Sequence, residues 1–139
     1  MAEISFLIYG EPKGKARPRV TRYGTYTPES TRKYEALVRK SWQERGAEPF
    51  PDDATLYCTI HAHFAIPNSY TKKRKRELAF APHTKKPDCD NVAKAVLDAL
   101  NGLAFHDDSA IAKLVVEKTY TDANPYVGVT LSDEPPITE

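Results

Sequence analysis

Residues 56–66 alternate apolar and polar side chains without a break, and this pattern constrains the fold more than any other feature of the chain. A period of two is typical of a strand with one buried face. We therefore predict a central strand here. Its apolar face begins with Leu56 and Cys58, whereas His61 and His63 lie on the opposite face. The two histidines could ligate a metal, but no third ligand is evident, and a polar strand face explains them better.

The other elements are predicted from hydrophobic periodicity and turn residues. They are a strand at 4–9, a hairpin tip at 21–26, a helix that begins at 27–29 and ends near 45, a short helix from 69 to about 80, a helix at 90–101, and a final hairpin of strands 111–120 and 126–131. Strands and helices do not alternate regularly. This favours an α+β fold with a mixed or mostly antiparallel sheet and about three helices. We expect a single domain, 1–139, with a flexible tail at 132–139.

Charge is distributed unevenly along the chain. Residues 1–94 contain 18 Lys and Arg against 11 Asp and Glu, whereas residues 95–139 contain 2 against 8. This asymmetry fits a surface that binds a polyanion around a metal pocket, although uneven surface charge is also common. There is neither an apolar run long enough for a membrane span nor a secretory signal, and Cys58 and Cys89 lack metal-type spacing. We expect a cytoplasmic protein with reduced thiols and no membrane partner.

Two basic segments, together with the lysines at 85–86, are candidates for contact with a phosphate backbone. The first segment interleaves cations with Gly14, Pro18 and two tyrosines, and the second is a run of five cations in the predicted short helix. The residues predicted to bind DNA are Lys13, Lys15, Arg17, Arg19, Arg22, Lys72, Lys73, Arg74, Lys75, Arg76, Lys85 and Lys86. A solvated loop and a solvated helix face would explain the same residues without DNA.

The stretch 85–109 holds most of the acidic residues that we associate with chemistry. Pro87 disfavours the helical region for the residue before it, so the chain is expected to be extended through Asp88 and Asp90. Both carboxylates would then lie on one side, with Cys89 turned away. We predict Asp90 as the N-cap of the following helix and Gly102 as its end.

That helix has an apolar stripe and a separate polar stripe. The apolar positions are Val92, Val96 and Ala99, continued by Leu103, and the polar positions are Asn91, Lys94, Asp98 and Asn101. A second acidic pair, Asp107 and Asp108, follows after the short piece 103–105. Whether the two acidic pairs meet depends on how that piece folds back.

Three or four converging aspartates with few His or Cys ligands suit Mg²⁺ or Mn²⁺ better than zinc. Lys94 lies one turn into the helix and could stabilise charge on a phosphate in the transition state. The alternative is that the aspartates are caps and turn residues. In that case Lys94 and Asp98 would form a surface ion pair four residues apart.

The segment KPDCDNVAKAVLDALNGLAFHDDSAI resembles the signature region of the RusA family of Holliday-junction resolvases. The family pattern is roughly D-x-D-N-x-x-K-A-x-x-D-A-L-(N)-G, followed by D-D-(S). Upstream, GKARPRVTRYGTYTPESTRKYE is similar to the amino-terminal segment of one RusA subgroup. Two departures are Pro87, where some members have an arginine, and Cys89, where a bulkier aliphatic residue is common.

The resemblance implies a small homodimeric endodeoxyribonuclease that resolves four-way DNA junctions by paired symmetric nicks in recombination and repair. By position, it implies that Asp88, Asp90, Lys94 and Asp108 are catalytic. The same three aspartates, helped by Asp107, would bind Mg²⁺, with Mn²⁺ as a substitute. A metal-dependent nuclease for other branched DNA and a non-catalytic DNA-binding protein are the alternatives.

Overall fold

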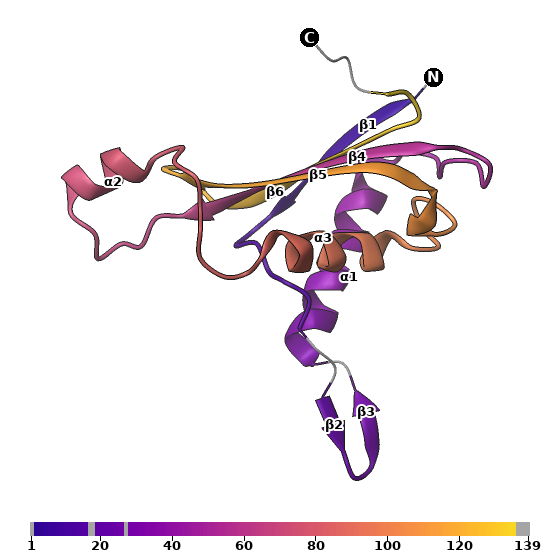
Figure 1. Ribbon diagram of the computed structural model, residues 1–139, viewed down its shortest axis with the longest axis horizontal. Coiled ribbons are helices and arrows are strands. Elements are labelled where there is room, and N and C mark those ends of the chain that lie inside the picture. The colour runs from indigo at the N-terminus through magenta and orange to yellow at the C-terminus, as the bar shows by residue number, and fades with distance from the viewer. Residues whose placement is uncertain (1, 17–18, 27, 136–139) are drawn as a thin grey trace.

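Figure 1 shows one twisted sheet with two helices, α1 and α3, on one of its faces. The computed structural model describes residues 2–16, 19–26 and 28–135, without the side chains of residues 19 and 26. Its elements are β1 (Glu3–Tyr9), β2 (Arg19–Thr21), β3 (Gly24–Tyr26), α1 (Glu29–Arg45), β4 (Leu56–Ala65), α2 (Lys72–Leu78), α3 (Cys89–Leu100), the 3₁₀ turn η1 (Asp108–Ala110), β5 (Ile111–Thr121) and β6 (Tyr126–Ser132). The predicted α+β class, with a mixed sheet and three helices, is confirmed.

β4 lies inside the four-stranded sheet, whose strand order is β1-β6-β4-β5. It pairs antiparallel with β6 and parallel with β5, so its predicted central place is confirmed. The predicted hairpin of the last two strands is wrong, because β4 lies between them. Pairing on both edges satisfies the backbone groups of β4. It also sets Cys58 opposite Leu131 and Ile60 opposite Val129, and all four side chains are buried.

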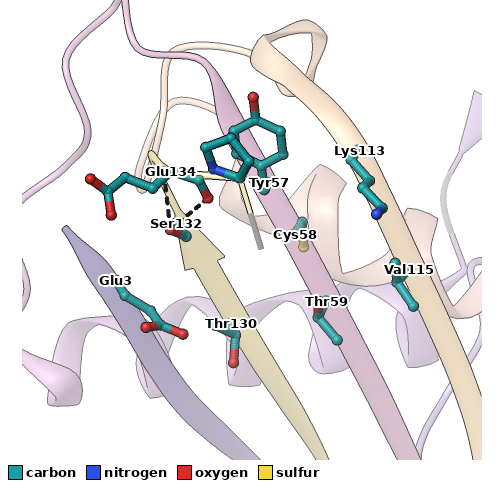
Figure 2. A pocket seen from close by; sticks show the side chains of 10 residues that line it. Glu3, Tyr57, Cys58, Thr59, Lys113, Val115, Thr130, Ser132 and Glu134 are labelled. Atoms are coloured by element: carbon teal, nitrogen blue, oxygen red, sulfur yellow. Dashed lines mark hydrogen bonds between the residues drawn. The ribbon is translucent and has the colours of Figure 1, made fainter. Parts of the chain in front are cut away.

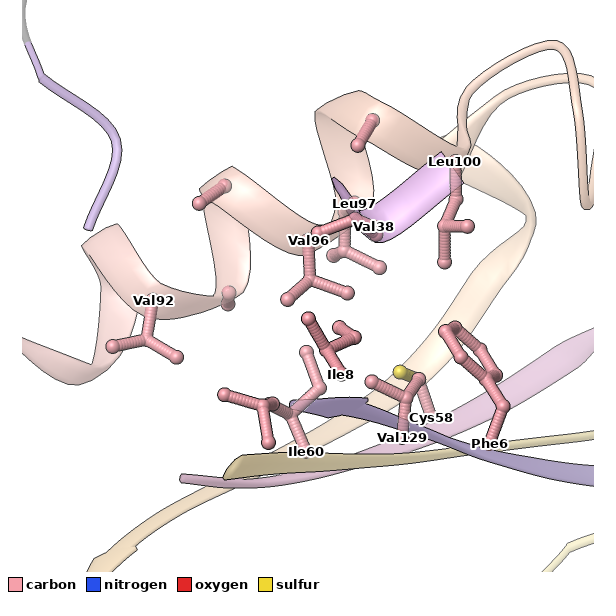
Figure 3. Close-up of a cluster of buried hydrophobic side chains, with 14 of the residues drawn as sticks. Phe6, Ile8, Val38, Cys58, Ile60, Val92, Val96, Leu97, Leu100 and Val129 are labelled. Atoms are coloured by element: carbon pink, nitrogen blue, oxygen red, sulfur yellow. The ribbon is translucent and has the colours of Figure 1, made fainter. Parts of the chain in front are cut away.

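The core lies between the sheet and the helices α1 and α3. Figure 3 shows Val96 of α3 on the side of the helix that faces Ile60 and the other strand residues. Val92 and Val96 are almost completely buried, as expected for the apolar stripe of a helix that covers a sheet. Trp42 of α1 meets the Phe6 ring edge-on, with 5.6 Å between the ring centroids. The predicted apolar stripe therefore determines which face of α3 turns toward the sheet.

The predicted hairpin and the predicted first helix agree with the structure, whereas the start of α2 differs. The hairpin predicted at 21–26 is present as β2 and β3. The helix predicted from 27–29 is described from Glu29 onward, and residue 27 lies outside the described residues. α2 begins later than the predicted start at 69, because Thr71 is its N-cap and Thr71 Oγ1 accepts a hydrogen bond of 3.1 Å from the backbone N–H of Arg74.

The start of α3 corrects the prediction for the first acidic pair. The helix begins at Cys89, so Asp88 occupies the N-cap with extended backbone and Asp90 lies in the first turn. Proline restricts only the residue before it, so nothing prevents the helix from starting two residues after Pro87. The expected extended geometry across both aspartates is therefore wrong. The predicted end is confirmed, since Asn101 is the C-cap and Gly102 follows with φ +76°.

The two ends of the described chain meet at one end of the sheet. The backbone N–H of Ala2 donates to Oδ1 of Asp133 at 2.8 Å, and the N–H of Asp133 donates to the carbonyl of Ala2 at 3.1 Å. β6 includes Ser132, so the sheet extends into the segment predicted as a tail. Residues 136–139 lie outside the described part. In the ranges that the structure describes, no helix has the length and apolar character needed to span a membrane.

The arm that follows β1 lies against the start of α3. The N–H of Lys15 donates to the carbonyl of Asn91 at 3.0 Å. A Cβ built on Gly14 would lie 2.7 Å from Cβ of Pro87 and 3.2 Å from Cβ of Asn91. Carbon atoms pack best at about 3.5–4.0 Å, so only glycine fits here without a shift. The arm is thus held next to the turn that carries Asp88.

We expect Gly14→Ala to disturb this contact, because the added methyl group would overlap Pro87 and Asn91. Overpacking of this kind lowers the free energy of unfolding by about 1–3 kcal/mol. Urea denaturation measures the global loss, and limited trypsin digestion after Lys13 and Lys15 detects release of the arm.

Gly128→Ala is the matched control for this variant. A Cβ at Gly128 would meet Leu7 Cδ2 at 3.7 Å, which is an ordinary contact. We expect little change in either assay for the control. Equal behaviour of the two variants would contradict the close approach of the arm.

Candidate metal site and nucleic-acid interface

The first two carboxylates of α3 have no hydrogen-bond or ion-pair partner among the described residues. Asp88 is the N-cap, yet its side chain makes no capping hydrogen bond. Asp90 lies in the first turn, and both residues are exposed. The positive end of the helix dipole favours negative charge at this position. Both carboxylates are therefore available to a ligand, and their hard oxygen atoms suit Mg²⁺ or Mn²⁺.

A hollow of ≈ 550 Å³ opens beside Asp88. Its lining combines the arm, the turn before α3 and the first turn of the helix, and consists of Gly14, Lys15, Lys86, Pro87, Asp88 and Asn91. A water molecule occupies roughly 30 Å³ in the liquid, so this volume has room for a hydrated ion together with a phosphate group.

Lys94 lies one turn after Asp90 on the exposed side of α3. The alternative in which it pairs with Asp98 is not what the structure contains. Instead, Oδ2 of Asp98 lies 3.4 Å from Nζ of Lys15, and no ion pair of Lys94 is found in the described residues. The ammonium group of Lys94 is consequently free to meet a phosphate.

Lys15 is held by two carboxylates. Its Nζ lies 3.0 Å from Oε1 of Glu35 in α1 and 3.4 Å from Oδ2 of Asp98 in α3. The side chains of Lys15 and Glu35 are only 17% and 11% exposed. Lys15 thus connects the arm to both helices. The predicted contact of Lys15 with DNA stays a prediction. This geometry does not favour it, because a phosphate would have to compete with the two carboxylates.

The second acidic pair lies at the far end of α3. Oδ2 of Asp107 accepts a hydrogen bond from the N–H of Ser109 at 3.0 Å and caps η1. Ser109 lowers the pKa of Asp107, first through its side chain and then through its backbone N–H. The N–H of Asp108 donates to Oδ1 of Asn101, the C-cap of α3, at 2.9 Å. Local hydrogen bonds therefore keep this pair beside the end of the helix.

The two acidic pairs do not converge within one chain. α3 has 12 residues, and a rise of 1.5 Å per residue separates its N-cap from its C-cap by about 20 Å. Across residues 2–16, 19–26 and 28–135, no group of three His, Cys, Asp or Glu side chains could hold a metal ion. The piece between the helix and the second pair turns into the core, where Ala104 and Phe105 are buried. The predicted ligand roles of all four aspartates stay predictions.

The β2–β3 hairpin projects away from the sheet in Figure 1. At its turn, Nη2 of Arg22 donates to the hydroxyl of Tyr23 at 2.8 Å, and the guanidinium lies 5.0 Å from the ring centre. Tyr23 is 85% exposed, so the tip presents a cation and an aromatic ring to solvent. Lys13 is exposed as well. Arg17 lies outside the described residues, and so does the side chain of Arg19.

α2 forms a second projection, at one end of the sheet (Figure 1). None of its residues is buried, and it carries the cations Lys72, Lys73, Arg74, Lys75 and Arg76. The guanidinium of Arg74 lies 6.0 Å from the centre of the Tyr70 ring, and the Tyr70 hydroxyl accepts a hydrogen bond of 3.4 Å from Nζ of Lys85. Tyr70 therefore links α2 to the exposed lysines at 85–86, which directly precede the turn of Asp88.

The face of the sheet opposite α1 and α3 carries polar residues and an aromatic stack. A hollow of ≈ 330 Å³ opens on this face. Glu3, Thr59 and Thr130 are among its lining residues (Figure 2). Further along β4, His61 stacks on His63 with 3.9 Å between the ring centroids, and His63 stacks on Tyr126 at 4.2 Å. The two histidines are thus part of an aromatic stack on the polar face of the strand.

Burial accounts for two further pKa shifts near the central strand. It raises the pKa of the Cys58 thiol to about 12, which favours the protonated thiol at neutral pH. It also lowers the pKa of His83, whose ring stacks on Phe64 at 3.7 Å. The positive charges of Lys118 and Lys85 lower that pKa further. Positive charge therefore gathers around the segment that leads to Asp88.

The sequence did not point to Glu35 or Lys118, although both form bonds to segments next to the site. Nζ of Lys118 donates to the carbonyls of Lys85 and Pro87 at 2.7 and 2.8 Å. The available signal was a lysine at a position of β5 where the period of two predicts an apolar residue. Glu35 left no such signal, because a glutamate in a surface helix is ordinary.

Two comparisons place the chain among known proteins. Residues 9–132 match the family model described as endodeoxyribonuclease RusA. The chain is also 34% identical over 139 aligned residues to Uncharacterized protein YqaN of Bacillus subtilis (strain 168), and the match covers 94% of this chain and 96% of that protein. The family match includes both acidic pairs, Lys94 and both basic projections. The protein belongs to the RusA family of endodeoxyribonucleases.

Proposed function

We propose that this protein is a Mg²⁺-dependent endodeoxyribonuclease that acts as a homodimer and resolves four-way DNA junctions by paired symmetric nicks. The observation that carries the proposal is the pair of exposed carboxylates at the start of α3, Asp88 and Asp90, in a chain of the RusA family. A carboxylate that is used only as a cap would bond to its own helix, and the side chain of Asp88 does not.

The donor set suits Mg²⁺, which takes hard oxygen ligands, often only one or two carboxylates, and keeps several waters. Asp88 and Asp90 would hold it beside the hollow of ≈ 550 Å³. When bound, the ion supplies an activated water and compensates negative charge on the phosphate. Mn²⁺ prefers similar ligands and would substitute for it.

The cations around this site have separate roles. Lys94 stabilises the charge that develops on the phosphate oxygens next to Asp90. Lys86, which lines the hollow, binds the scissile phosphate or its neighbour. The hairpin tip and α2 hold DNA further out through phosphate contacts, and the exposed ring of Tyr23 offers a surface on which an unpaired base can stack.

A homodimer gives the second acidic pair a function. Asp107 and Asp108 are about 20 Å from Asp88 along α3, so they can join its site only from another chain. In a two-fold symmetric dimer, antiparallel α3 helices bring the end of each helix beside the start of the other, and two equivalent shared sites result. A four-way junction is also two-fold symmetric, so two such sites can cut two strands of like polarity.

Asp90→Asn tests the catalytic assignment. Metal stabilisation is worth several kcal/mol, so we expect cleavage of a synthetic four-way junction to fall about 1,000-fold. Junction binding in EDTA should stay the same or become tighter, because a negative charge near the phosphates is removed. The assay uses a junction labelled on each arm in turn, with Mg²⁺, Mn²⁺ or EDTA, beside matched forked and linear duplexes.

The matched control is Asp53→Asn, an exposed aspartate in the loop between α1 and β4, which should cleave like the wild type. Equal cleavage of forks and junctions would replace junction resolution with a broader branched-DNA nuclease. Binding without cleavage by the wild type in either metal would refute the enzyme and leave a DNA-binding protein.

Mixing two inactive variants tests the shared site. Asp88→Asn/Asp90→Asn and Asp107→Asn/Asp108→Asn should each be inactive alone. A dimer with one chain of each kind has one intact site if the sites are shared, and none if each site belongs to a single chain. Half of the dimers in an equal mixture are heterodimers with one site of two, so we expect about a quarter of the wild-type sites, and single nicks. If heterodimers of confirmed mass recover no cleavage, the shared site is refuted.

A further inference from the structure

The turn that precedes α3 is bonded to a lysine from the neighbouring strand. Lys118 lies in β5, on the same strand face as the buried Tyr120. Its Nζ donates to the carbonyl oxygen of Lys85 at 2.7 Å and to that of Pro87 at 2.8 Å. Pro87 is the residue directly before Asp88, so the second bond acts on the peptide that leads into the N-cap.

These two bonds have the geometry of strong interactions. Hydrogen bonds from a charged donor are shorter and roughly twice as strong as neutral ones. The backbone of Lys118 is tied to the same segment, because its carbonyl accepts from the N–H of His83 at 3.0 Å. Nζ also lies 6.0 Å from the centre of the Phe64 ring. Strand, ammonium group and turn therefore form one connected unit.

The turn is also confined by the arm that follows β1. Gly14 lies so close to Pro87 that an added Cβ would come within 2.7 Å of the proline Cβ. The N–H of Lys15 donates to the carbonyl of Asn91 in the first turn of the helix. The turn thus contacts both the arm and Lys118, while the carboxylates of Asp88 and Asp90 remain exposed.

We propose that Lys118 is a positioning residue for the metal-binding turn. Its ammonium group fixes the carbonyls of Lys85 and Pro87 and thereby the direction in which Asp88 presents its carboxylate. This role rests on the proposed function, because it assigns the fixed carboxylate to Mg²⁺. Lys118 does not contact DNA in this assignment, since two of its three donors are used by the turn.

Lys118→Met tests the assignment, because methionine retains an unbranched stem and loses the ammonium group. The matched control is Lys113→Met on the same strand, since Lys113 is exposed and has no hydrogen bond or ion pair among the described residues. The first measurement is hydrogen exchange of metal-free protein. We expect faster exchange of the Val92 amide, which donates to the carbonyl of Asp88 at 3.0 Å, and of the Lys15 amide, which donates to that of Asn91, in Lys118→Met. Wild-type rates are expected in Lys113→Met.

The second measurement is the binding of Mn²⁺ without DNA, followed by electron paramagnetic resonance of the free ion. Loss of a group that orients a metal ligand weakens metal affinity about 10–100-fold, and we expect a change of this size for Lys118→Met only. Cleavage by this variant should recover at high Mg²⁺, and junction binding in EDTA should match the wild type. Weaker Mn²⁺ binding together with unchanged junction binding distinguishes a displaced metal ligand from a general loss of structure.

Several outcomes decide between the proposals. Equal Mn²⁺ affinity of the two lysine variants, or unchanged exchange of the Val92 and Lys15 amides, overturns the role of Lys118. An increase of exchange throughout the protein, in proportion to a lowered melting temperature, overturns it as well. If Lys118→Met does not fold, Lys118→Gln, which retains an uncharged donor, decides by the same measurements. If the wild type neither binds Mn²⁺ nor cleaves, the proposed function itself fails. If the wild type binds and cleaves but the two lysine variants behave alike, only the role of Lys118 fails.

Discussion

The packing of α3 against the sheet is the constraint on which the candidate site depends. Val92 and Val96 are buried against the strands around β4, and this burial fixes the rotation of the helix about its own axis. Lys94 is then directed outward, and Asp88 and Asp90 are exposed at the start of the helix. Apolar burial contributes about 25 cal/mol per Å², so the interaction that stabilises the fold also sets the direction of the catalytic candidates.

Two lysines of this chain, Lys15 and Lys118, are bonded to other groups of the protein. Lys15 is bonded to Glu35 and Asp98, and Lys118 is bonded to two carbonyl groups. Removing a charge from water is costly unless hydrogen bonds compensate, and both ammonium groups have such partners. Their main effect is therefore on geometry, because Lys15 connects the arm to both core helices and Lys118 connects β5 to the turn that precedes α3.

The basic projections differ physically from the core that carries the carboxylates. α2 has no buried residue, and the tip of the β2–β3 hairpin is highly exposed. Elements with few buried contacts lie at the low end of local stability and can adjust to a ligand. The sheet and α3, by contrast, share one continuous core. The fold thus combines a packed core that carries the carboxylates with exposed basic surfaces around it.

The sequence by itself determined the local elements and the family. Period-two alternation located β4, the apolar stripe located α3, and the pattern from Asp88 to Asp108 indicated the RusA family that the match over residues 9–132 confirms. Only the tertiary structure decided that β4 separates β5 from β6, that the acidic pairs lie at opposite ends of α3, and that Lys118 holds the turn before Asp88. The reason is physical: side-chain periodicity is a property of neighbouring residues, whereas strand order and the partners of a lysine depend on contacts between segments far apart in the chain.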